Sequence, residues 1–198
     1  MTNATPCYHN YLTINHRGKG IPYGGLGEAR EDGDANFGFR YAKNNESLLK
    51  QIPELQTDVH LYRLAAAINA AETWLFTIGS GSYPIQDEHG HRYSGYMEFA
   101  INSKSAIADA QSYFPIFFHF DLFLKEKNFP VSISYCWELQ PACFIECDNA
   151  NGFTCSVFIN TDYSDLQQEA HDTWANALSV LGVYLRNVQS QRSDFLYS

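Results

Sequence analysis

The stretch "PVSISYCWELQPACFIECDNANGFTCSVFINTD" (residues 130–162) carries apolar residues at every second position over 131–147 and again over 153–159, which is the period of a half-buried strand. One face of its first segment is formed by Val131, Ile133, Tyr135 and Trp137. Pairing Trp137 with Cys143, and Cys143 with Val157, keeps this face apolar across neighbouring strands. We therefore predict three antiparallel strands joined by tight loops.

A long amphipathic helix is predicted directly after this stretch, over residues 165–189. Ser164 and Gln167 have the spacing of a capping box, which indicates where the helix begins. Apolar side chains recur at helical spacing and form one continuous stripe. The stripe consists of Leu166, Ala170, Trp174, Ala177, Leu178, Leu181, Leu185 and Val188. We expect it to lie on the sheet.

The upstream half of the chain alternates between strand and helix patterns. The predicted elements are strands near residues 8–15 and 36–42, helices from residue 46 divided at Pro53, a hairpin over 73–102, and a helix from Ala106 restarted at Pro115. Residues 116–124 are apolar on nearly every side, which predicts that this last helix is the deepest one.

This order of elements predicts an α+β fold with a mostly antiparallel sheet, covered on one face by about three helices. The length of 198 residues suits a single domain over residues 1–198. The order is loosely similar to that of type III secretion chaperones and related small acidic adaptors. This resemblance concerns topology, involves no shared motif and carries no functional assignment.

A glycine-rich acidic segment at about residues 16–35 suggests a phosphate loop, but the details argue against one. Lys19 is followed by Gly20 rather than by the Ser or Thr of a Walker loop. No amphipathic helix opens after the glycines, and the acidic residues that follow would repel a phosphate. We interpret the segment as a flexible loop.

Composition and charge narrow the classes of partner. A net charge of −9 argues against nucleic acid, because binding to it depends on cationic side chains. No run of apolar residues approaches the length of a membrane span, and the first twelve residues show no export signal. We therefore expect a cytoplasmic protein without membrane contact. Five cysteines without C-x-x-C spacing are expected to be reduced, buried side chains.

The carboxylates are unevenly distributed along the chain. Residues 128–185 contain seven Asp and Glu residues and no Lys or Arg. Four of the seven, Asp162, Asp165, Glu169 and Asp172, fall at the start of the last predicted helix. We interpret these four as candidate partner-binding residues, and expect a cytosolic interaction module, of adaptor, chaperone-like or immunity type, that binds a basic protein.

The alternative function is a small-ligand-binding protein or a metal-assisted hydrolase with His89, His91 and His119 around an aromatic pocket. His119 and Asp121 interrupt an apolar helix and are the candidate catalytic residues, although Lys125 is spaced to pair with Asp121. Asp87, His89 and His91 are candidate metal ligands, but they also suit a hairpin turn. We expect no cofactor. The sequence leaves open whether the chain is an enzyme and whether it forms a homodimer.

Overall fold

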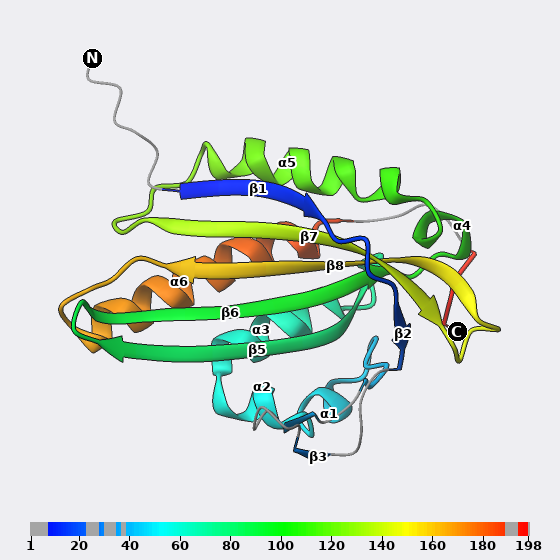
Figure 1. Cartoon of the computed structure of the whole chain (residues 1–198), viewed down its shortest axis with the longest axis horizontal. Helices are drawn as coiled ribbons and strands as arrows, with labels where there is room; N and C mark the ends of the chain where they lie inside the picture. Colours follow the sequence, from blue (N-terminus) through cyan, green and yellow to red (C-terminus); the bar gives the residue numbers. More distant parts are fainter. Residues whose placement is uncertain (1–7, 23–27, 30–34, 37–38, 189–193, 198) are drawn as a thin grey trace.

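The computed structural model of the chain describes residues 8–22, 28–29, 35–36, 39–188 and 194–197. Its centre is a six-stranded sheet with the order β1-β7-β8-β6-β5, in which β2 extends the edge formed by β1 (Figure 1). The strands are β1 (Tyr8–Ile14), β2 (Lys19–Ile21), β5 (Leu75–Asp87), β6 (Gly90–Ile101), β7 (Ile133–Phe144) and β8 (Ala150–Thr161). The sheet is mixed rather than antiparallel throughout, because β1 and β2 both run parallel to β7.

The central hairpin consists of two long strands instead of the three short ones predicted. Trp137 lies opposite Val157, and Cys143 lies opposite Asn151, so the predicted pairing of Trp137 with Cys143 is wrong. Pro141 is tolerated inside β7 because it falls between the part of the strand that pairs with β1 and the part that pairs with β2. The chain therefore continues through the proline and turns only after Phe144.

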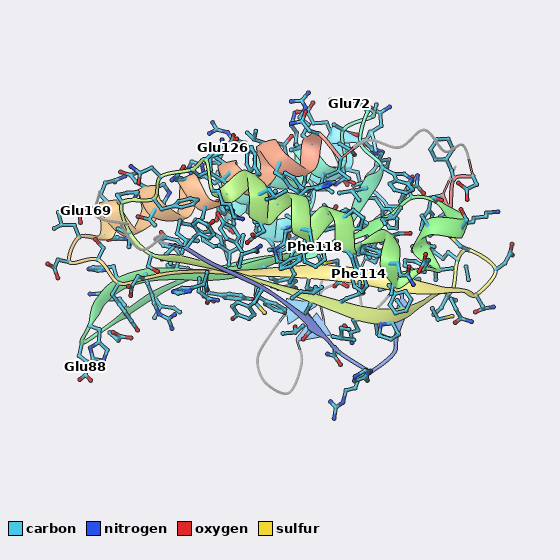
Figure 2. All side chains as sticks on the ribbon, turned by 90° about the horizontal axis from the view of Figure 1, so that it is seen from above. Glu72, Glu88, Phe114, Phe118, Glu126 and Glu169 are labelled. Atoms are coloured by element: carbon cyan, nitrogen blue, oxygen red, sulfur yellow. The ribbon has the colours of Figure 1, made fainter. Side chains whose placement is uncertain are left out.

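Helices cover one face of the sheet, as predicted. The helices are α1 (Glu46–Leu49), α2 (Pro53–Thr57), α3 (Val59–Ile68), α4 (Lys104–Ile107), α5 (Phe114–Leu124) and α6 (Gln167–Arg186), with a 3₁₀ turn at Ala110–Ser112. The main core lies between the sheet and helices α3, α5 and α6, which Figure 2 shows on the same side. The single α+β domain of the sequence analysis is confirmed.

Helix α6 presents the predicted stripe to the core, but it begins later than predicted. Its buried residues include Ala170, Trp174 and Leu181. Leu166 is the N-cap residue and is 58% exposed, and no side chain caps this end of the helix. The predicted capping box is wrong because the Ser164 hydroxyl donates to Glu169 Oε2 at 2.6 Å instead of capping a backbone amide.

Helix α5 is not the deepest helix, contrary to the prediction. Ile116, Phe120 and Leu124 are buried, whereas Phe118 is 60% and Leu122 is 56% exposed. The helix lies over β1 near one edge of the sheet, so only one of its sides faces the core (Figure 1). Apolar composition alone therefore misassigned its depth.

The second face of the sheet is covered at one end by irregular chain. A smaller core forms there around Phe76 and Phe144, with Phe39 and Leu196 packed against them. Residues 39–42 form no strand, although Phe39 and Ala42 are buried. The strand predicted near residues 36–42 is therefore not formed over 39–42, and Phe37 of that prediction lies outside the described residues.

The glycine-rich segment at 16–35 contains more regular structure than the predicted loop. Lys19–Ile21 form strand β2, and β3 (Glu28–Ala29) pairs with β4 (Ala35–Asn36) as a short ribbon. Residues 23–27 and 30–34 of the predicted loop lie outside the described part. None of the helices in the described residues combines the length and the apolar character needed to cross a membrane.

Candidate functional site

The turn between β5 and β6 is hydrogen-bonded to the connection between β8 and α6. The backbone N–H of His91 donates to Ser164 O at 2.9 Å, and the N–H of Ser164 donates to His91 O at 2.9 Å. These two reciprocal bonds hold together two parts of the chain that are more than seventy residues apart.

Gly90 allows this close approach. Its φ of +116° is a conformation that side chains rarely adopt. A Cβ atom at this position would also lie 2.6 Å from Ser164 O. The turn can therefore sit against the β8–α6 connection only with glycine at position 90.

Tyr163 makes a second link between the two segments. Its hydroxyl donates to Asp87 Oδ2 at 2.5 Å, and this bond, with a further one from the His89 backbone N–H, holds the pKa of Asp87 below its ordinary value. The guanidinium of Arg92 lies 5.1 Å from the centre of the Tyr163 ring. Tyr163 is thus held between a carboxylate and a cation.

The two linked segments carry six exposed carboxylates, which we call the acidic end: Asp87, Glu88, Asp162, Asp165, Glu169 and Asp172. Residues 83–91 and 162–172 contain no Lys or Arg, although the next residue, Arg92, places one cation beside Asp87 and Tyr163. Figure 2 shows Glu88 and Glu169 at the same end of the molecule. The acidic end includes all four predicted partner-binding residues, and adds two carboxylates from a distant hairpin.

The acidic end borders a hollow of about 490 Å³ lined by Tyr93, Gln167, Gln168 and His171. The ring of Tyr93 stacks on Trp174 with 5.7 Å between centroids, so its orientation is held by the core. The ring of His171 meets the rings of Tyr93 and of His60 on α3 edge-on, with 6.0 Å and 5.2 Å between the ring centroids. An aromatic and amide-lined surface therefore adjoins the carboxylates.

The candidate metal ligands Asp87, His89 and His91 take part in the turn instead. Asp87 accepts from the backbone N–H of His89 at 2.8 Å, and His89 Nε2 lies 3.7 Å from Glu88 Oε1. Over the residues that the structure describes, no three His, Cys, Asp or Glu side chains gather in a way that could hold a metal ion.

His119 lies far from the other two candidate histidines. It lines a hollow of about 440 Å³ together with Asn187 and Val188, just beyond the end of α6, whereas His91 is bonded to Ser164 before its beginning. A helix of 20 residues spans about 30 Å, so the three histidines do not share the pocket that the alternative function requires. Lys125 pairs with Asp121 at 3.8 Å, as its spacing predicted.

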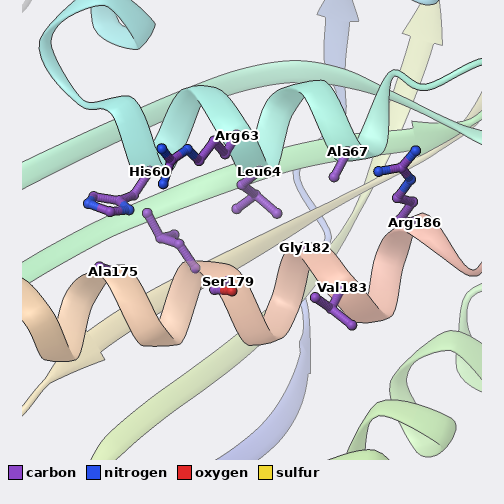
Figure 3. Close-up of a pocket in the computed structure, with 10 residues that line it drawn as sticks. His60, Arg63, Leu64, Ala67, Ala175, Ser179, Gly182, Val183 and Arg186 are labelled. Atoms are coloured by element: carbon purple, nitrogen blue, oxygen red, sulfur yellow. The ribbon is translucent and has the colours of Figure 1, made fainter.

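A third hollow, of about 200 Å³, is a furrow between α3 and α6 (Figure 3). Its middle is lined by small or apolar side chains such as Leu64 and Ala67, with polar groups toward its ends. Figure 3 shows His60 and Arg63 at one end and Arg186 at the other. Arg186 is paired with Glu72 at 3.0 Å. The two arginines thus do not converge on one ligand atom.

The sequence reasoning missed the residues that assemble the acidic end, which are Gly90, Tyr163 and Ser164. A glycine inside the polar turn was the one available signal, and it does not reveal which distant segment the turn approaches. Neither a protein-family model, nor a curated protein, nor a solved structure matches this chain.

Proposed function

We propose that the chain is an interaction module that binds a basic protein partner through the acidic end, in the manner of an adaptor, a chaperone-like protein or an immunity-type inhibitor. The observation that carries the proposal is the pair of backbone hydrogen bonds between His91 and Ser164. They bring carboxylates from two distant segments into one exposed cluster.

The electrostatics favour this role over a purely structural one. Carboxylates at the start of a helix are stabilised by its amide end, which explains Glu169 and Asp165 near the beginning of α6. Asp87 has a structural role as well, because it accepts hydrogen bonds from Tyr163 and the His89 N–H. Neither explanation extends to Glu88, which lies on the neighbouring turn and adds negative charge to the same surface. Clustered charge of one sign speeds the encounter with an oppositely charged partner.

The test compares two charge reversals that change the net charge equally. The first variant is Asp165→Lys/Asp172→Lys in the acidic end. The control is Glu126→Lys/Glu146→Lys, whose two residues are exposed and lie outside it. Each protein is immobilised, a partner is captured from native cell extract and identified, and association rates are measured with the purified partner at two salt concentrations.

We expect the wild type and the control to bind the same basic protein, and the first variant to associate at least about tenfold more slowly at low salt. The rate for the wild type should fall as salt rises, because exposed charges are screened beyond about 8–10 Å at ordinary ionic strength. Equal rates for both variants would refute the proposal. Retention of a small molecule, with no protein captured by the wild type, would favour the ligand-binding alternative.

A further inference from the structure

Residues Asp194–Tyr197, here called the tail, form neither helix nor strand and pack against the rest of the chain. Leu196 is 6% exposed and belongs to the smaller core on the second face of the sheet, whereas the preceding Phe195 is 53% exposed. Of the four side chains, that of Phe195 points mainly to solvent, whereas Asp194, Leu196 and Tyr197 contact the rest of the chain.

Asp194 is the polar anchor of the tail. Its carboxylate accepts from the Ser103 hydroxyl at 2.8 Å, from the Ser105 N–H at 2.9 Å and from the Ser105 hydroxyl at 2.5 Å. The backbone oxygen of Asp194 accepts from the Lys104 N–H at 2.8 Å. These donors match a carboxylate, and a neutral side chain in this position could not accept from all three groups.

Tyr197 is bound through both its backbone and its ring. Its N–H donates to Asn102 Oδ1 at 2.9 Å, and the side-chain amide of Asn102 donates to Tyr197 O at 3.3 Å. The ring stacks on Tyr41 with 4.4 Å between centroids and meets Phe76 edge-on at 5.3 Å. The surrounding residues therefore select an acidic residue, a free position, a leucine and an aromatic residue in that order.

We propose that this surface, the tail site, is a peptide-binding site for an Asp-x-Leu-Tyr segment of a partner protein, and that the tail occupies it in the free chain. The inference is independent of the acidic end, because the two sites lie at opposite ends of β6. The tail site includes Asn102, directly after the last residue of β6, whereas the acidic end adjoins Gly90, its first residue. Two of the hydrogen bonds to Asp194 are exposed to solvent, and Leu196 is the one tail residue that is buried, so the tail can leave without unfolding the main core.

Hydrogen exchange in the wild-type protein tests whether the tail detaches. The backbone N–H groups of Lys104 and Ser105 donate to Asp194, and the N–H of Tyr197 donates to Asn102. These three amides should exchange at least about 100-fold faster than the amides that are hydrogen-bonded between β7 and β8. Equal exchange rates in the two sets would show that the tail opens only with global unfolding, and would overturn the proposal.

Peptide binding tests the site directly in the full-length chain. A labelled peptide with the sequence of residues 193–198, SDFLYS, is titrated into the variant Asp194→Ala/Leu196→Ala, whose own tail should not compete. Saturable binding is expected, and the wild type should bind at least about tenfold more weakly because its tethered tail is present at an effective concentration on the order of millimolar. A peptide with Phe195→Ala should bind equally well, and one with Leu196→Ala should not bind.

A folded variant, with native circular dichroism, that binds none of the peptides would overturn the proposal. Size-exclusion chromatography over a range of protein concentrations measures whether the chain forms a dimer. A wild-type dimer that is lost in the Leu196→Ala variant would show that the segment comes from a second copy of the chain, which would overturn a partner protein as its source.

Discussion

The indole Nε1 of Trp174 donates a 2.7 Å hydrogen bond to Asp58 Oδ2. Asp58 is also the N-cap residue of α3, where its other carboxylate oxygen accepts from the backbone N–H groups of His60 and Leu61. One carboxylate therefore joins the start of α3 to the middle of α6. The packing of these two helices on the sheet depends on this junction.

Replacing Trp174 by alanine should lower the free energy of unfolding by about 3–5 kcal/mol, because the side chain is fully buried and its loss leaves a cavity. Val183→Ala on the same helix is the control, since Val183 is 54% exposed and should change stability by less than about 0.5 kcal/mol. Urea denaturation measures both. Similar losses in the two variants would contradict the assigned packing.

Acid should weaken the junction at Asp58. Burial raises the pKa of this carboxyl, but hydrogen bonds from Trp174, the Leu61 N–H, Ser82 and the His60 N–H outweigh it and hold the pKa below the ordinary 3.8. A carboxyl with a lowered folded-state pKa stabilises the fold above its unfolded pKa, and this contribution is lost as the pH falls through the folded value.

The measurement is the difference in unfolding free energy between the wild type and Asp58→Asn as a function of pH. We expect the wild-type advantage to be constant from pH 7 to about pH 5 and to shrink progressively below about pH 4. An advantage that does not change with pH would show that the ionised form of Asp58 is not the stabilising one.

Gly90→Ala should separate the β5–β6 turn from the β8–α6 connection, because the added Cβ would meet Ser164 O and the backbone conformation is strained. A loss of roughly 1–3 kcal/mol in stability is expected. Gly18→Ala is the matched control, since a Cβ there meets no described atom within 4 Å. Hydrogen exchange of the His91 and Ser164 amides should be faster in Gly90→Ala than in the wild type, and unchanged in Gly18→Ala. Unchanged exchange in Gly90→Ala would contradict the local effect.

Two phenylalanines on α5 should respond differently to truncation. Phe120 is fully buried and Phe118 is 60% exposed, so Phe120→Ala should cost about 3–5 kcal/mol and Phe118→Ala less than about 0.5 kcal/mol. Thermal or urea unfolding of the two variants checks this. A greater cost at Phe118 would restore the idea that α5 is buried on all sides.

Among the cysteines, Cys155 should react with thiol reagents only after unfolding. It is 1% exposed, and burial raises the pKa of its thiol, which lowers the fraction of reactive thiolate. Cys136, Cys143 and Cys147 are only half-buried, so the expectation that the cysteines are buried applies to Cys155 but not to these three. Peptide mapping after native labelling should find Cys136 modified before Cys155, and the reverse order would contradict the placement of β8.

The sequence determined the elements whose patterns are long and local. The hairpin of β5 and β6 and the buried stripe of α6 follow from periods of 2 and 3.6, and these periods hold wherever the elements pack. The tertiary structure decided how the elements meet. Periodicity cannot show that β1 runs parallel to β7, that Pro141 fits inside a strand, or that α5 lies at an edge with Phe118 exposed.

The same division holds for the candidate site. The carboxylates at the start of α6 are visible in the sequence because they are close together along the chain. Their association with Asp87 and Glu88 depends on the backbone bonds between His91 and Ser164, whose geometry requires that β5, β6 and β8 pair in one sheet. Local charge can be read from composition, whereas the shape of a charged surface is set by contacts between residues distant in the chain.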